Sequence, residues 1–169
     1  MVQLEAGAFD DLVADLADLL FDAVDSGASV GFVRPFTRAD AAAWWRSIAP
    51  DVTHGVTLVL AASVDGRVVG TAQLRLAQLP NSRHRAEVAK VLVHRDARRR
   101  GVGRALMSAV EDLARRHGRT LLFLDTITGT DAVRLYEGLG WTRAGEIPRY
   151  AGMPGGTLAP TTIFFKDLR

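Results

Sequence analysis

Apolar residues recur at every third or fourth position over residues 8–24, and aspartates fill the polar positions between them. This spacing predicts an amphipathic helix whose acidic face is solvated. A second helix is expected over residues 38–48, with Thr37 as its N-cap. Trp44 and Trp45 are neighbours on that helix, so only one of them can face the core squarely.

The pattern changes after residue 55 to the alternation that is typical of strands. Strands are expected over residues 56–64 and 68–76, joined by a tight turn at Asp65-Gly66, and over residues 85–93. The rest of the chain predicts a helix over residues 101–117, a buried strand over 121–124, a helix over 131–139, and strands over 141–145 and 162–165. Helices and strands in this order indicate one mixed α/β domain spanning residues 1–169.

The composition narrows the class of protein. Of the 169 residues, 48% are hydrophobic and 24% are charged, as in an ordinary globular protein, and the net charge of +2 gives no global field for binding nucleic acid. The absence of cysteine excludes disulfides and thiolate chemistry, and the four histidines lack metal-ligand spacing. The chain starts without a basic and apolar leader, and no apolar run is long enough to span a bilayer. We therefore expect a cytoplasmic protein without metal, nucleic-acid or membrane partners.

The basic residues gather where the third predicted strand gives way to a helix. There, Arg98-Arg99-Arg100-Gly101-Val102-Gly103 follows an apolar run that ends at Val93. The first amides of a helix lack internal partners and carry the positive end of its dipole, and glycine lets the backbone approach a ligand closely. This junction predicts a site for the diphosphate of a cofactor. The alternative is a basic surface turn that binds RNA, which the lack of interleaved aromatic residues and of a second basic patch disfavours.

Two motifs in this order resemble the GCN5-related N-acetyltransferase superfamily: Arg98-x-x-Gly101-x-Gly103, and the run Ala-Val-Arg-Leu-Tyr-Glu-Gly-Leu-Gly-Trp over residues 132–141. The resemblance implies an α/β fold in which a mixed, mostly antiparallel sheet of about six to seven strands is flanked by about four helices. It also implies transfer of an acetyl group from acetyl-CoA to an amine. Short strings, among them Ala86-Glu-Val-Ala-Lys90 and Leu124-Asp-Thr126, are similar to tabtoxin-resistance-type acetyltransferases.

The resemblance also implies which residues bind coenzyme A. The strand before the junction would hold the pantetheine through its backbone, and an amide of Val91 or Leu92 would stabilise the thioester oxygen. The implied cofactor contacts are Val91, Leu92, Val93, Arg98, Arg99, Arg100, Gly101, Val102, Gly103, Arg104, Ala105, Thr126 and Tyr136. Many family members carry a pantetheine-binding Asn near position 129, where this chain has Gly129, so that contact is expected from Thr126, Thr128 or a backbone group.

Three residues are candidates for the chemistry. Glu87 stands where well-studied family members place a catalytic base, although a pairing with Arg85 or His84 is the alternative. Asp125 follows a buried strand and rivals Glu87 as base or as anchor of the acceptor's ammonium, unless it merely caps the next turn. Tyr136 is the expected acid for the leaving thiolate, with packing in a helix stripe as its alternative. Because cysteine is absent, we expect direct attack in a ternary complex.

The acceptor amine is expected between residues 27–36 and 149–160, where the resemblance places it. Its predicted contacts are Phe32, Arg34, Trp45, Arg149 and Tyr150, the alternative being that the aromatic residues are core and the arginines solvated. These residues suit a small acceptor with a carboxylate and an amine, such as an amino acid or a dipeptide-like toxin or antibiotic. The alternatives are a protein N-terminus or lysine as acceptor, and a non-catalytic acyl-CoA sensor. Whether the protein is a monomer or a homodimer is left open.

Overall fold

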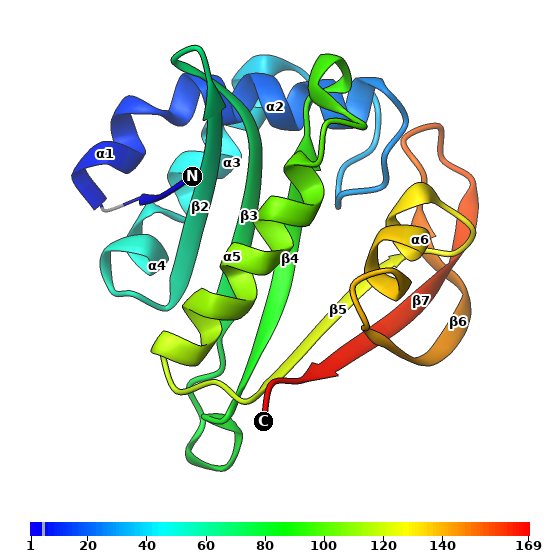
Figure 1. Cartoon of the computed structure of the whole chain (residues 1–169). Coiled ribbons are helices and arrows are strands. Elements are labelled where there is room, and N and C mark those ends of the chain that lie inside the picture. Colours follow the sequence, from blue (N-terminus) through cyan, green and yellow to red (C-terminus); the bar gives the residue numbers. More distant parts are fainter. Residues whose placement is uncertain (5) are drawn as a thin grey trace.

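The computed structural model describes residues 1–4 and 6–169 as a seven-stranded sheet with helices on both faces (Figure 1). The spatial order of the strands is β1-β2-β3-β4-β5-β7-β6. The strands are β1 (Val2–Leu4), β2 (Thr57–Val64), β3 (Arg67–Leu76), β4 (Arg85–Val93), β5 (Leu121–Ile127), β6 (Thr142–Gly152) and β7 (Leu158–Asp167). Every neighbouring pair is antiparallel except β4 and β5, which run parallel. This is the mixed, mostly antiparallel sheet that the resemblance implies.

The helices form two layers that bury opposite faces of the sheet. The α-helices are α1 (Ala6–Asp11), α2 (Val13–Asp25), α3 (Arg38–Ser47), α4 (Ala49–Thr53), α5 (Val102–Arg116) and α6 (Asp131–Glu137). Helices α5 and α6 pack on one face, where Leu106, Val110 and Leu113 enter the larger core cluster. Helices α1 to α4 cover the other face through a second cluster that includes Leu16 and Trp45. The end of the sheet formed by β6 extends beyond both layers, and nearly all of its side chains are exposed.

The described residues contain six α-helices where about four were expected. The predicted helix over residues 8–24 is divided at Leu12, and the turn there lets Phe9 pack edge-on against Trp45, with ring centroids 6.1 Å apart. Pro50 lies in the first turn of α4, where its missing N–H leaves no helical bond unmade. Strand β1 is too short for its periodicity to be visible in the sequence.

Strands β4 and β5 pair only at one end and then separate, as Figure 1 shows. Their last paired residues are Glu87 and Phe123. On its other side β4 stays paired with β3, but the register shifts so that two residues of β4, at 90 and 91, oppose one residue of β3. Lys90 takes a left-handed conformation in this bulge, with φ of 49°. The bulge and the separation leave residues 88–93 with one backbone edge that no described strand covers.

Candidate functional site

The open edge of β4 leads directly into the N-terminus of α5. Gly101 is the N-cap of α5 with φ of 82°, a left-handed conformation that glycine adopts without strain. The amide of Ala105 donates to the carbonyl of Gly101 at 3.0 Å, so the amides of Val102, Gly103 and Arg104 have no acceptor within the helix. The open edge of β4 and this helix N-terminus are thus two sets of backbone donors, separated by residues 94–98, whose amides already have acceptors. Together the two sets fit a long ligand that ends in a diphosphate.

Gly103 sets how closely α6 approaches this junction. A Cβ on Gly103 would lie 3.3 Å from Cδ2 of Leu135 and 3.9 Å from Cγ2 of Val93. The second glycine of the motif thus lets a residue of α6 pack over the first turn of α5. This contact holds α6 close to the start of α5 and to Val93 at the end of β4.

The arginines of the junction do not all point outward. Nε of Arg98 donates to the carbonyl of Val93 at 3.1 Å, and its Nη2 donates to Oγ of Ser26 at 2.9 Å. Arg98 stays one of the predicted diphosphate contacts, and in the structure its guanidinium ties the loop to β4 and to the end of α2. Arg99, Arg100 and Arg104 are exposed, as is Ala105, and the three arginines are free to meet an anion at the surface.

Tyr136 lies in α6 with 5% of its surface exposed, packed against Trp141 and Phe164. Burial raises the pKa of its phenol, and the charge of Asp125 adds to the rise, so the hydroxyl keeps its proton. The Tyr136 ring thus packs as predicted. Its hydroxyl has no hydrogen-bond partner in the part of the chain that the structure describes, so it can still donate to a ligand. The neighbouring Thr128 is committed elsewhere: its Oγ1 contacts Oγ1 of Thr162 at 2.8 Å and Oε2 of Glu146 at 3.2 Å.

Glu87 and Asp125 lie on the face of the sheet that α2 and α3 cover. The strand register places Glu87 beside Arg75, and the two side chains approach to 3.5 Å. Arg75 also donates to Oε1 of Gln73, at 3.1 and 3.2 Å. The partner of Glu87 is thus Arg75 and not Arg85 or His84, the partners that the sequence offered. Asp125 is exposed on β5, just past the point where β5 leaves β4.

Lys90 is a site residue that the sequence analysis missed. Its Nζ lies 5.0 Å from the ring centroid of Trp44 and 5.8 Å from that of Phe32. The pKa of this amine is lowered to about 8, first by burial and then by the charge of Arg75, while the carboxylates of Glu87 and Asp125 act in the opposite direction. In the sequence Lys90 reads as one more strand position, and only its left-handed backbone carries the side chain to these aromatic rings.

The residues predicted to line the acceptor site separate into two groups. Phe32 lies at the predicted acceptor site and packs edge-on against Trp44, with ring centroids 5.6 Å apart. Trp45 does not: it is fully buried, and its Nε1 donates to the carbonyl of Leu16 at 2.9 Å. Because the two tryptophans point to different sides of α3, the structure places Trp45 in the core and Trp44 at the site.

The two loops expected to flank the acceptor do meet. The amide of Arg34 donates to the carbonyl of Pro154 at 3.0 Å, and Oγ of Ser29 donates to the carbonyl of Gly152 at 2.9 Å. The guanidinium of Arg34 is turned toward α2, where Nη2 donates to the carbonyl of Asp25 at 2.6 Å. On β6, Arg149 and Tyr150 are exposed, and Arg149 has φ of 54°.

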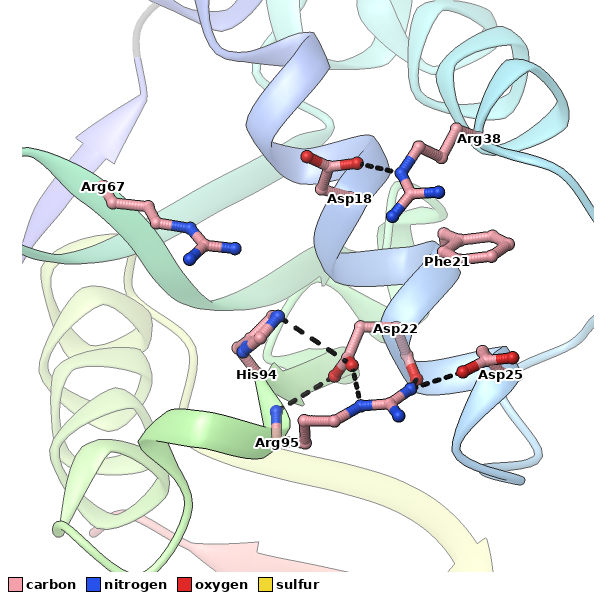
Figure 2. Close-up of a pocket in the computed structure, with 8 residues that line it drawn as sticks. All are labelled: Asp18, Phe21, Asp22, Asp25, Arg38, Arg67, His94 and Arg95. Carbon is pink, nitrogen blue, oxygen red and sulfur yellow. Dashed lines mark hydrogen bonds and ion pairs between the residues drawn. The ribbon is translucent and has the colours of Figure 1, made fainter.

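Two surface hollows lie away from these residues. The first, of about 250 Å³, is drawn in Figure 2 between α2 and the loop that follows β4. Most of its charges are paired with one another: Arg38 with Asp18, and Arg95 with both Asp22 and Asp25. The second, of about 380 Å³, lies beside His84 and Asp167. Neither hollow contains a predicted catalytic or cofactor-binding residue.

Across residues 1–4 and 6–169, no group of three or more His, Cys, Asp or Glu side chains is placed to hold a metal ion. None of the helices in that part of the chain is both long enough and apolar enough to cross a membrane.

Comparison with known proteins gives the same fold. Residues 12–141 match the model of the acetyltransferase (GNAT) family. The structure of yncA from Salmonella typhimurium with its cofactor acetyl-CoA is 23% identical, with a TM-score of 0.79, over 100% of this chain and 94% of that one. A ribosomal-protein-alanine N-acetyltransferase from Brucella melitensis is 22% identical, with a TM-score of 0.80, over 99% of each chain. A GCN5-related N-acetyltransferase from Kribbella flavida is 23% identical, with a TM-score of 0.76, over 94% of this chain and 93% of that one. At these identities the solved structures share the fold with this chain.

Proposed function

The chain belongs to the acetyltransferase (GNAT) family, and from that premise we propose that it transfers the acetyl group of acetyl-CoA to the primary amine of a small molecule by direct attack in a ternary complex. The observation that carries the proposal is the presence, among the described residues, of two sets of backbone donors: one on the open edge of β4 and one in the first turn of α5. Acetyl-CoA supplies an activated acetyl group on a thioester. Residues 1–169 are proposed to act as one catalytic domain.

The cofactor would lie along the gap between β4 and β5. In this proposal Val91, Leu92 and Val93 bind the pantetheine through their backbone, with Thr126 opposite on β5. The amides of Gly101, Val102, Gly103 and Arg104 hold the diphosphate, and the exposed Arg99, Arg100 and Arg104 add charge. Each charge-assisted hydrogen bond of this kind contributes roughly 1.5–3 kcal/mol, so a few of them suffice for micromolar binding.

Backbone and phenol groups would stabilise the two charges that develop during transfer. An amide of Val91 or Leu92 donates to the thioester oxygen, where negative charge grows. The Tyr136 hydroxyl donates to the leaving sulfur. A free phenol, with a pKa of about 10, is a weaker acid than a free thiol of about 8.5, so full proton transfer costs at least about 2 kcal/mol. Since burial raises the pKa of Tyr136 further, its role is to donate a hydrogen bond and keep the proton.

The acceptor would enter from the face that carries Glu87 and Asp125. These two carboxylates attract its ammonium, and Phe32 with Trp44 forms an apolar wall. Arg149, exposed on β6, supplies a cation near the meeting point of the two loops, which suits an acceptor that also bears a carboxylate, whereas the guanidinium of Arg34 is held against the end of α2. The hydrogen bonds between those loops hold them together on one side of the proposed acceptor site, which favours a small molecule: an amino acid, or a toxin or antibiotic such as tabtoxin-resistance-type enzymes acetylate. A protein N-terminus is the second candidate, because a ribosomal-protein-alanine N-acetyltransferase shares the fold over the whole chain.

Calorimetry and thiol release test this proposal together. Because the chain contains no cysteine, a thiol reagent sees only the coenzyme A that the reaction releases. We expect acetyl-CoA to bind, and coenzyme A to be released with one class among amino acids, dipeptides, aminoglycosides, polyamines and a peptide with an N-terminal alanine. Release with the peptide alone would replace the small-molecule acceptor by a protein. Binding without release for every amine would favour the acyl-CoA sensor, and no binding at millimolar acetyl-CoA would refute the enzyme.

A further inference from the structure

The backbone places Lys90 at the point where the sheet opens. Gln73 of β3 pairs with Ala89, whereas Thr71 pairs with Leu92, so Lys90 lies in the extra length of β4. A left-handed conformation is costly for a residue with a Cβ and is maintained only when the surroundings require it. Here it turns the Lys90 side chain toward Gly31, Phe32 and Trp44, immediately before the backbone amides that face the gap.

The amine of Lys90 has aromatic neighbours but no ionic partner. Its Nζ lies over the rings of Phe32 and Trp44, and no carboxylate among residues 1–4 and 6–169 comes within 4.0 Å of it. Lys166 is different, because its Nζ is held by both oxygens of Glu111 and by the carbonyl of Leu139, at 2.7 to 2.8 Å.

The choice of lysine at this position is itself informative. Only two of the 21 basic residues in the chain are lysines, and the other nineteen are arginines, which do not lose their proton in proteins. Lysine differs from arginine mainly in that its amine can be neutral when it is buried. A lysine in this half-buried place therefore points to a role that needs the proton to leave.

We propose, given the acetyl transfer described above, that Lys90 is the catalytic base: its neutral amine takes a proton from the acceptor's ammonium. The N–H bond of the ammonium breaks, its electron pair stays on the acceptor nitrogen, and that nitrogen then bonds to the thioester carbon as the carbon–sulfur bond breaks. The nitrogen loses two protons in all. The first passes to Lys90 and from there to solvent, and the second ends on the leaving thiolate as coenzyme A thiol.

The charged groups around Lys90 suit this role. Arg75 faces it from β3, Glu87 from β4 and Asp125 from β5, while α3 and the loop before it contribute only aromatic rings. The resulting pKa of about 8 matches that of an α-amino group, which is about 7.7–8.0, so proton transfer between them is nearly balanced. A free carboxylate, titrating near 4, is about four pH units less basic than such an amine. Glu87 and Asp125 are then left to attract the ammonium.

Two substitutions separate a base from a fixed charge. The guanidinium of Lys90→Arg keeps the positive charge but cannot give up its proton. The side chain of Lys90→Met has a similar length but carries neither a charge nor a basic group. Both variants retain a Cβ, so the backbone strain at this position is unchanged. Arg46→Met removes an exposed cation from α3, the helix that carries Trp44, and serves as the matched control.

We expect Lys90→Arg and Lys90→Met each to lower kcat by ~100-fold or more, the usual effect of losing a general base. The Kd for acetyl-CoA should stay within about twofold, and Arg46→Met should behave as wild type. In the wild type, kcat should rise with pH through about 8, and this rise should disappear in both variants. If Lys90→Arg keeps the wild-type kcat, the lysine acts only as a charge. If both variants have a lowered kcat that still rises with pH as in the wild type, the lysine has a structural role. Either result overturns the proposal.

A labelling experiment tests Lys90 without any acceptor. Acetic anhydride modifies only neutral amines, and mass spectrometry of the intact chain and its peptides distinguishes Lys90 from Lys166. We expect the labelling of Lys90 to have its midpoint near pH 8. A midpoint near 10.4, as in a free lysine, would refute Lys90 as the base even if the enzyme is active. A wild-type protein that binds acetyl-CoA but acetylates no amine would instead refute the proposed function, whatever the midpoint.

Discussion

Asp22 offers the sharpest test of how the loop that leads to the proposed cofactor site is held. Its side chain is 8% exposed at the end of α2 and points into the hollow of Figure 2. It accepts hydrogen bonds from the backbone amide of Arg95, at 3.0 Å, and from Nε of the same residue, and Nε2 of His94 lies 3.8 Å away. Arg95 also binds Asp25. These contacts fix the start of the loop that ends at Gly101, so we predict that Asp22→Ala weakens both stability and acetyl-CoA binding.

The magnitude follows from the groups that lose their partners. The hydrogen bond from the Arg95 amide to a carboxylate contributes about 1.5–3 kcal/mol, whereas the ion pair with the half-exposed guanidinium adds only about 0.2–1 kcal/mol. Asp22→Ala should therefore lower the free energy of unfolding by about 2–4 kcal/mol. Asp18 is the matched control, one helical turn earlier on α2, because its pair with Arg38 is exposed on both sides. Asp18→Ala should cost at most about 1 kcal/mol.

Urea unfolding followed by circular dichroism measures both changes, and calorimetry measures the Kd for acetyl-CoA. We expect Asp22→Ala to raise that Kd about tenfold, which corresponds to about 1.4 kcal/mol for ordering the loop on binding. Asp22→Asn should fall between the wild type and Asp22→Ala, because its amide oxygen still accepts a bond from the Arg95 amide. The reasoning is refuted if Asp22→Ala and Asp18→Ala change the unfolding free energy equally, within about 0.5 kcal/mol.

Three further predictions concern the site itself. Tyr136→Phe should lower kcat about ten- to a hundredfold, the worth of a hydrogen bond to a charged sulfur, with the Kd for acetyl-CoA within about twofold; unchanged kcat would remove the hydroxyl from the chemistry. Glu87→Gln and Arg75→Met should shift the pH dependence of kcat in opposite directions, because Glu87 raises the pKa of Lys90 and Arg75 lowers it. Loss of Glu87 should thus move the midpoint to lower pH and loss of Arg75 to higher pH, and a collapse of kcat in Glu87→Gln at low pH would instead identify Glu87 as the base. Gly101→Ala should lower the free energy of unfolding by about 1–2 kcal/mol and weaken acetyl-CoA binding. A Cβ at this position would meet no neighbouring atom, but the backbone φ of 82° is strained for any residue with a Cβ. A variant as stable as the wild type would show that the loop adapts.

Local signals were sufficient for most of the fold. Strand β4 occupies residues 85–93 as predicted, and α5 begins within one residue of its predicted start, because alternation, glycine and helix periodicity are all local in the sequence. Strands β6 and β7 are longer than predicted, since each extends into the Gly/Pro-rich segment over residues 152–160. Hydrogen bonding between the two strands, and not their own composition, keeps that segment extended.

Side chains whose role depends on a distant neighbour could not be assigned in this way. Helical spacing showed that Trp44 and Trp45 face different sides of the helix. It did not show which of them is buried, because that depends on the Leu16 carbonyl, which accepts a hydrogen bond from Nε1 of Trp45. Arg98 belongs to a motif that indicates an anion site, yet Val93 and Ser26 are its partners. Charge pairing of this kind joins residues far apart in the chain, and composition does not reveal it.

The sequence by itself determined the order of the elements and the place where a strand opens into a helix with unpaired amides, because backbone hydrogen bonding and glycine conformation are properties of short segments. Only the tertiary structure decided which side chains share the proposed acceptor face. The bulge in β4 turns Lys90 toward Phe32 and Trp44, and its surroundings include Arg75, Glu87 and Asp125 from three different strands. Burial and electrostatic interaction depend on distances in space, and those distances are set only when the sheet and its helices have packed together.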